Sequence, residues 1–337
     1  MKRIKKGLLT VFDAPSLAFS DDVLRCCFLA HPNFIKSDGF IFVLNRTVLI
    51  HDGGMVQNRD IYDKLVEIKK SICPEKPLEL IWVLSHYHPD HIGAIIDYVI
   101  GNSLFSFRKI FLPPSCDMTQ LFPDNAESKF KPLLLKMIKD YQPQAKITEL
   151  MFASCGGEPV SFELAHKQLS SVPNNTAKIT LFPPDSNWSD PNLMNDIIIN
   201  GYYDGDVTRP VSTCIINASS LWMLVSYSGR RMLFTGDSMK RTSKIKNESF
   251  DRMIDLWSKY IGRDLDLLKW PHHGMVRNNA LNGVMSMTPS NILVTTVVES
   301  ASKYTAENCP DCSSVFFNNA NKDVCVEIGP DGTFEIF

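Results

Sequence analysis

Short apolar runs alternate along this chain with segments whose apolar residues recur every three or four positions. A short apolar run bounded by turn residues is typical of a buried strand. The runs predict strands at residues 8–12, 24–30, 40–44, 48–50, 78–84, 109–112, 147–152, 178–182, 214–216, 221–227, 232–234 and 265–270.

The helical period is clearest where Ile61, Leu65, Ile68 and Ile72 follow one another at spacings of four, three and four residues. This pattern predicts an amphipathic helix that covers one face of a sheet. This stripe and similar ones predict helices at residues 58–72, 125–141 and 248–261. A further helix is predicted at residues 91–100, directly after the histidine-rich motif described below. The pair Asn45-Arg46 is expected to turn the strands on either side of it into a hairpin.

The strongest chemical signal comes directly after the strand predicted at 78–84. Four potential metal ligands follow it in the pattern H-x-H-x-D-H: His86, His88, Asp90 and His91. Imidazole together with carboxylate suits zinc, and also iron or manganese. A polar loop with chance histidines is the alternative, but three of the eight histidines crowd into six positions here. We therefore expect a metal site.

The local geometry of the motif follows from its residue types. Residues two apart in an extended chain point the same way, so His86 and His88 can hold one ion. Pro89 is expected to interrupt regular structure, because it has no N–H to donate. Asp90 then lies on the loop and His91 opens the next helix, where both can face a second ion.

Two later predicted strands also end in ligand-type residues. Asp237 follows the strand 232–234, and the pair His272-His273 follows the strand 265–270. Three strands far apart in the sequence thus each deliver ligands at their carboxyl ends, where α/β folds place their chemistry. This repetition favours one shared site over three unrelated turns.

These motifs resemble the metallo-β-lactamase superfamily. The elements are the H-x-H-x-D-H motif, the Asp52-Gly53-Gly54 turn before it, Thr235-Gly236-Asp237, and residues 268–274. The last two are most similar to the ComEC-like branch, and the resemblance covers roughly residues 37–337. It implies a four-layered αβ/βα sandwich of the α/β class, a site for one or two metal ions, and hydrolase activity.

The resemblance also implies roles for single residues. Asp237 would bridge two ions, Asp52 would support the metal loop, and His273 would be a ligand. His272 would face the substrate as a catalytic residue, although the two histidines can exchange roles. The resulting ligand sets are His86, His88 and Asp237 for one ion, and Asp90, His91, Asp237 and His273 for the other.

One position departs from the family. Most members with two ions carry another histidine about twenty residues before the bridging aspartate, whereas this chain has Asn217 and serines there. Asn217 is a weak oxygen donor, so either one or two ions are expected. Zn²⁺ lowers the pKa of its bound water from 15.7 toward about 7, which gives hydroxide at neutral pH. Asp90 would orient this nucleophile and pass on its proton.

The composition limits which ligands and which cellular compartment we expect for this protein. The net charge is −2 and the pI is about 6.4, so no global basic field draws in nucleic acid. Nine cysteines, an odd number without a visible framework, indicate reduced thiols in the cytoplasm. The apolar stretch 7–12 is too short for a signal peptide or a membrane span. We expect a single domain over residues 1–337, with an insertion or lid around residues 142–213.

The substrate is the least determined feature. Lys240 and Arg241 closely follow Asp237 and can bind a phosphate or carboxylate, or form a solvated helix start. With the family branch, this favours a phosphodiester in a nucleic acid or a small phosphorylated molecule. Hydrolysis of a lactone, lactam or thioester is the competing prediction. A catalytically silent metal-binding sensor or interaction module stays open too, and a protein partner is unknown.

Overall fold

The strands form two sheets in a computed structural model that describes residues 22–29, 37–116, 124–164, 176–185, 211–238, 249–274, 281–295, 312, 314–317 and 323–337. In spatial order, the strands of the first sheet are β15 (Phe334–Ile336), β14 (Val324–Ile328), β1 (Leu24–Phe28), β2 (Gly39–Leu44), β3 (Thr47–Asp52), β4 (Leu78–Val83), β5 (Phe105–Leu112) and β6 (Lys146–Glu149). Those of the second sheet are β13 (Ser314–Phe317), β12 (Asn291–Val294), β11 (Leu267–Lys269), β10 (Arg230–Phe234), β9 (Trp222–Tyr227), β8 (Ala177–Phe182) and β7 (Val160–Leu164).

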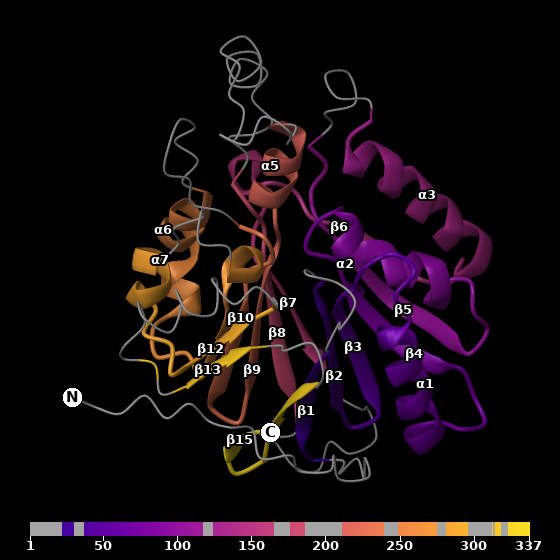
Figure 1. Cartoon of the computed structure of the whole chain (residues 1–337), viewed down its shortest axis with the longest axis horizontal. Helices are drawn as coiled ribbons and strands as arrows, with labels where there is room; N and C mark the ends of the chain where they lie inside the picture. Colours follow the sequence, from indigo (N-terminus) through magenta and orange to yellow (C-terminus); the bar gives the residue numbers. More distant parts are fainter. Residues whose placement is uncertain are drawn as a thin grey trace.

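The helices lie on the outer faces of the two sheets and at the ends of their strands. Their bounds are α1 (Asp60–Ile72), α2 (Pro89–Ala94), the π-helix η1 (Ile95–Val99), α3 (Ala126–Tyr141), the 3₁₀-helix η2 (Ala153–Cys155), α5 (Val211–Ala218), α6 (Ser249–Ile261), the 3₁₀-helix η3 (Pro271–Gly274) and α7 (Leu281–Ser286). Figure 1 shows α1 and α3 on one side of the sheets and α6 and α7 on the opposite side. The four-layered αβ/βα fold predicted from the sequence is confirmed.

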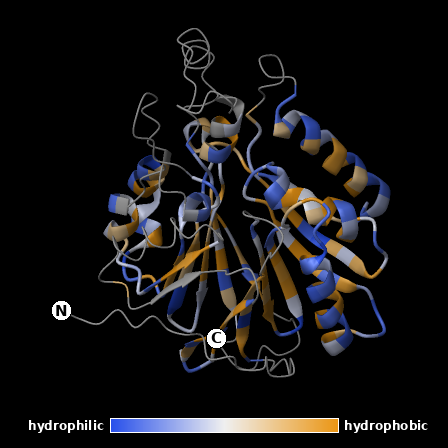
Figure 2. Cartoon of the chain, viewed as in Figure 1, coloured by the Kyte–Doolittle hydropathy of each residue, from blue (hydrophilic) through white to orange (hydrophobic). Residues whose placement is uncertain are grey.

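Three apolar cores explain these layers. In β2, Phe40 and Phe42 join a core between the sheets, while Ile41 and Val43 join the core beneath α1 and α3. A third core packs α6 and α7 against the second sheet. Because both faces of the sheets are covered there, central strands such as β2 and β9 carry continuous apolar runs, whereas edge strands such as β6 and β7 alternate with polar residues. Figure 2 shows this contrast between strands and the outer faces of the helices.

The predicted helices agree closely with the structure where their stripes are long. The helix predicted at residues 125–141 is α3, and Asn125 caps it by accepting a hydrogen bond from Ser128 N. Its Leu134 and Ile138 are buried, whereas Leu133 is 42% exposed. The predicted hairpin turn is also present, since Asn45 and Arg46 both have positive φ, as a type I′ turn requires.

Two local predictions are wrong. Residues 214–216 form part of helix α5 and not a strand, because so short an apolar run does not distinguish the two by period. Pro89 does not interrupt regular structure but begins helix α2, so Asp90 lies in the first helical turn and not on the loop. Proline suits the first helical position, where its missing N–H would have no partner within the helix.

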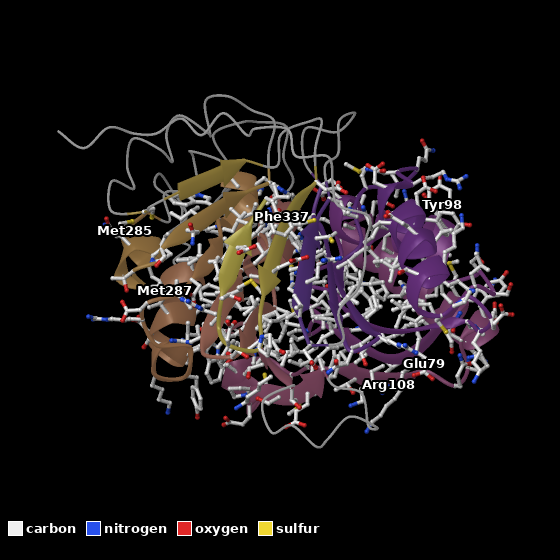
Figure 3. All side chains as sticks on the ribbon, turned by 90° about the horizontal axis from the view of Figure 1, so that it is seen from below. Glu79, Tyr98, Arg108, Met285, Met287 and Phe337 are labelled. Atoms are coloured by element: carbon white, nitrogen blue, oxygen red, sulfur yellow. The ribbon has the colours of Figure 1, made fainter. Side chains whose placement is uncertain are left out.

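Side chains fill the space between the layers (Figure 3), with Tyr98 on the side of the first sheet and Met287 on the opposite side.

The strand predicted at residues 8–12 lies outside the described residues. So do residues 165–175 and 186–210 of the predicted insertion, whereas β6, η2, β7 and β8 fall within its described part. Among the described helices, none has both the length and the apolar character needed to cross a membrane.

Gly93, two residues after the H-x-H-x-D-H motif, packs closely against the backbone of Val56. A Cβ at this position would lie 2.1 Å from the backbone nitrogen of Val56. Gly93→Ala is therefore expected to lower the free energy of unfolding by about 1–3 kcal/mol, as overpacking does. Chemical denaturation checks this, with Gly101→Ala as control, because its Cβ would meet nothing closer than 3.8 Å. Equal stability of the two variants would contradict the prediction.

Candidate metal centre

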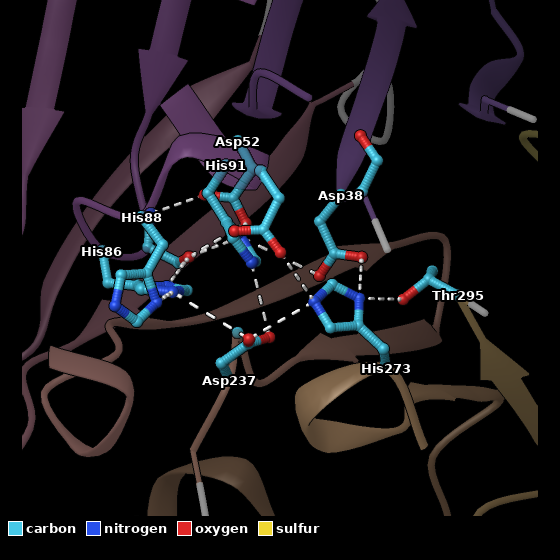
Figure 4. Close-up of polar contacts among 12 residues, drawn as sticks. Asp38, Asp52, His86, His88, His91, Asp237, His273 and Thr295 are labelled. Atoms are coloured by element: carbon cyan, nitrogen blue, oxygen red, sulfur yellow. Dashed lines mark hydrogen bonds and ion pairs between the residues drawn. The ribbon is translucent and has the colours of Figure 1, made fainter. Parts of the chain in front are cut away.

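Ligand-type side chains from both sheets meet at the ends of their strands (Figure 4). Four buried residues, Asp38, His91, Asp237 and His273, each offer a ligand atom, and these atoms lie within 4.8 Å of one another. Asp38 precedes β2, His91 lies in α2 after β4, Asp237 follows β10 and His273 follows β11. The candidate site thus combines pieces of the chain that are up to 235 residues apart.

Asp237 lies at the centre of this group. Its Oδ1 is 3.5 Å from His91 Nε2, and its Oδ2 is 3.3 Å from His273 Nε2. Oδ2 is also 3.7 Å from His272 Nε2 and 4.0 Å from His86 Nε2. Both oxygens of one carboxylate therefore face imidazoles, which is the arrangement that a bridging ligand needs.

The imidazoles of His91 and His273 are each oriented by a carboxylate. His91 Nδ1 lies 2.9 Å from Asp52 Oδ2, and His273 Nδ1 lies 3.3 Å from Asp38 Oδ1. Such contacts fix the ring so that Nε2 is the free ligand atom. Asp90 Oδ2 approaches that atom of His273 to 3.3 Å. Asp38 and Asp90 are therefore both candidate carboxylate ligands beside His273.

Asp52 also holds the start of the segment 85–91, which carries the H-x-H-x-D-H motif. Its carboxylate accepts hydrogen bonds from Ser85 N at 2.7 Å and from Ser85 Oγ at 2.9 Å, in addition to its contact with His91. The residue has a φ of 59°, a left-handed conformation that Asp tolerates better than most residues. The supporting role that the resemblance implies for Asp52 is therefore compatible with its contacts.

A second group of imidazoles lies on the Oδ2 side of Asp237. His86 Nε2 is 3.1 Å from His88 Nδ1, and His86 Nδ1 is 2.9 Å from Ser85 Oγ. His272 Nε2 lies 3.4 Å from the amide nitrogen of Asn217. Asn217, which stands in the sequence where the resemblance implies a histidine, therefore lies beside His272.

In the turn after β11, two consecutive histidines both approach Asp237 Oδ2, His272 Nε2 at 3.7 Å and His273 Nε2 at 3.3 Å. His272 and His273 have φ values of 49° and 53°, and Gly274 follows at 73°. Non-glycine residues rarely adopt this region, and such strain is concentrated at functional sites. His272 N donates a hydrogen bond to Gly236 O at 3.2 Å, which ties this turn to the residue before Asp237.

The two groups of imidazoles differ in protonation. Burial lowers the pKa of His86 well below its usual value and that of His88 to about 4, so both are neutral. Burial also opposes the charge on His91 and His273. Their neighbouring carboxylates, Asp237 foremost, outweigh it and raise the pKa of His91, and that of His273 to about 10. Protons therefore supply positive charge at the place where the carboxylates gather.

Buried atoms without hydrogen-bond partners provide the test of whether an ion fits. Within the described part of the chain, His91 Nε2, His273 Nε2 and Asp237 Oδ1 are buried and make no hydrogen bond. Such atoms are rare in native proteins and need an explanation. They are two imidazole nitrogens and a carboxylate oxygen, with a further carboxylate from Asp90, and this donor set fits zinc.

Some residues of the site were not predicted from the sequence, and two predicted ones cannot be placed. Asp38 and Lys269 were missed. Lys269 is fully buried at the end of β11, beside Asp38 and Asp237. A charged residue inside the apolar run 265–270 was the available signal. Lys240 and Arg241 lie outside the described residues.

No family model and no curated protein matches this chain. Similar solved structures include the metallo-beta-lactamase fold protein YhfI from Bacillus subtilis, at 13% identity and a TM-score of 0.45, covering 94% of this chain and 100% of that one. Unliganded yeast PDE1 matches at 11% and 0.46, covering 88% and 97%. The short form of human tRNase Z matches at 9% and 0.38, covering 87% and 91%. These values are too low to transfer a reaction, so the fold assignment rests on the layers and strand order.

Replacing Asp52 should weaken metal binding without removing a ligand. Asp52→Asn is expected to lower zinc affinity about 10- to 100-fold, because the amide supports His91 and the metal loop less well. Competition with a chromogenic chelator measures this affinity. Glu149→Gln, which changes a carboxylate on the edge strand β6, is the matched control and should bind zinc as the wild type does. Unchanged affinity in Asp52→Asn would contradict the role inferred for Asp52.

The metal-free protein should lose stability as the pH rises from about 6.5 to 10. The pKa of His91 is raised in the folded state, and that of His273 is raised to about 10. The folded state then binds these protons more tightly than the unfolded state does. The two protonated histidines therefore stabilise the fold fully below the unfolded pKa of about 6.5, and this contribution is lost as the pH rises above it. Melting temperatures in EDTA check this, and His273→Asn should flatten the decline. A melting temperature that rises over this range would contradict the prediction.

Proposed function

We propose that this protein is a metal-dependent hydrolase that uses zinc and acts on phosphodiesters. The observation that carries the proposal is the set of three buried ligand atoms, His91 Nε2, His273 Nε2 and Asp237 Oδ1, that converge without hydrogen bonds. A divalent cation would satisfy all three and compensate the charge of the surrounding carboxylates. When bound, it supplies a water of lowered pKa and a Lewis acid for the phosphoryl oxygen.

Asp90 is suited to orienting the nucleophile and moving its proton. Its side chain is 16% exposed, whereas those of Asp38 and Asp52 are fully buried and that of Asp237 is 3% exposed. Asp90 is therefore the carboxylate of this group that solvent reaches most easily. Burial opposes its charge, but the neighbouring His91 and His273 lower its pKa, so it is ionised and can orient a water molecule by accepting its hydrogen bond.

His272 and Asn217 would act on the substrate. His272 Nε2 lies near both Asp237 and the Asn217 amide, and its side chain is 6% exposed. An imidazole and an amide can both donate hydrogen bonds to a phosphoryl oxygen as charge develops on it. Lys240 and Arg241 follow Asp237 in the sequence and would bind a further phosphate oxygen.

A metal-binding module without turnover is the second candidate. The observation in its favour is that Asn217, an amide at the position where the resemblance implies an imidazole, lies beside His272. A centre with fewer strong donors on this side can bind one ion and serve recognition. Metal content and turnover together separate the two candidates.

Hydrolysis of bis-p-nitrophenyl phosphate by the purified protein tests the proposal. We expect activity that EDTA removes and zinc restores. His88→Ala should reduce it more than 100-fold, because the loss of a residue that only supports a ligand already costs about 10- to 100-fold in activity. Cys155→Ser, at an exposed position, is the control and should be fully active.

The remaining outcomes distinguish the alternatives. Activity that survives both EDTA and His88→Ala would contradict a metal-dependent mechanism. Zinc-loaded protein that cleaves only lactones, lactams or thioesters would contradict the substrate class while keeping the mechanism. Zinc-loaded protein that is inactive on all of these substrates would favour the binding module.

A further inference from the structure

Lys269 is a fully buried lysine in direct contact with the candidate metal centre. Its Nζ forms an ion pair with Asp38 Oδ2, donates a hydrogen bond to Gly236 O at 2.9 Å and lies 3.6 Å from Asp237 Oδ1. Lysine is almost never fully buried unless it is paired. Nothing proposed above for the hydrolytic reaction uses this residue.

The strand register explains why a charged side chain lies here. Along β11, Leu267 packs in the core between the sheets and Leu268 in the core beneath α6. Successive side chains of a strand point to opposite faces, so Lys269 points toward the space between the sheets, as Leu267 does. At this end of β11 that space holds Asp38, which comes from the opposite sheet. An apolar residue at position 269 would leave Asp38 buried without this partner.

The carboxylates around Lys269 repel one another in a buried environment. Asp38 and Asp237 both belong to the group whose ligand atoms lie within 4.8 Å of one another, and Asp52 and Asp90 contact the same imidazoles. Without compensating charge, such a group takes up protons or moves apart. The ammonium is the one lysine or arginine charge in contact with these carboxylates in the described ranges.

We propose that Lys269 is a built-in counter-cation that holds Asp38 and Asp237 in their ligand geometry before a metal ion binds. Asp38 in turn orients His273 through its Nδ1, so the position of the ammonium is transmitted to a candidate ligand. Lys269 is a positioning residue, because its Nζ is enclosed by protein oxygens and its side chain has no exposed surface. This inference rests on the proposed metal binding only where it concerns the response to zinc.

The test compares melting temperatures with and without zinc for four proteins. Wild type and Lys269→Met are compared with the double variant Lys269→Met, Asp38→Asn, in which both partners are neutral. The fourth protein is Lys131→Met, the matched control, which loses an ion pair with Glu149 of 2.6 Å at the edge strand β6. Circular dichroism measures all four in EDTA and in zinc.

We expect Lys269→Met to melt at least about 5 °C lower than Lys131→Met in EDTA, because an unpaired buried carboxylate is strongly destabilising. Zinc should raise its melting temperature more than that of the wild type, because the cation replaces the missing positive charge. The double variant should recover most of the stability lost in EDTA. Equal deficits with and without zinc, or no recovery in the double variant, would overturn the inference.

Two further outcomes are also decisive. If Lys269→Met does not fold, a folded double variant supports the inference, and an unfolded one overturns it because the unpaired Asp38 is then not the cause. If the wild type does not respond to zinc, the proposed function fails. Recovery of stability by Asp38→Asn would in that case still support the pairing of Lys269 with Asp38.

Discussion

Compensation of buried charge is the constraint on which this site depends. Asp38, Asp52, Asp90 and Asp237 are brought together at one end of two packed sheets, where water is largely excluded. In such an environment isolated carboxylates are unstable, and each must gain a cation, a proton or several hydrogen bonds. Here imidazoles, one ammonium and the Ser85 backbone N–H fill these roles. The geometry of the centre follows from how these partners share four carboxylates.

The two halves of the fold supply complementary parts of the centre. The first sheet contributes Asp38, Asp52 and the H-x-H-x-D-H motif, and the second contributes Asp237, Lys269 and the histidine pair. The halves are joined at this point by backbone as well as side chains, since Leu221 N donates a hydrogen bond to Ser85 O at 3.0 Å. Left-handed backbone at Asp52, Gly236, His272 and His273 lies at the same junction. The apolar core between the sheets holds these strained turns in place, so the fold and the site are not separable.

Much of this arrangement could be predicted from the sequence, and the remainder has identifiable physical reasons. Long periodic segments such as α3, and apolar runs such as β4, carry their own signal, and the motif after β4 carries its chemistry. Asp38 could not be found in this way, because it precedes an ordinary strand and acquires its role only through contacts with Asp90, His273 and Lys269. Residues 214–216 were misassigned because their helix is short and its apolar residues are continuous.

The centre is asymmetric in a way that bears on how it would bind ions. His91 and His273 have carboxylates behind their Nδ1 atoms, whereas His86 has the hydroxyls of Ser85 and Ser220. A carboxylate behind an imidazole raises its basicity as a ligand more than a neutral hydroxyl does. Under the proposed function, the side formed by Asp90, His91, Asp237 and His273 is therefore the stronger site, and it is also the side that Lys269 compensates. Asn217 lies beside His272, away from that side, so an amide in place of an imidazole there leaves the stronger half of the centre complete.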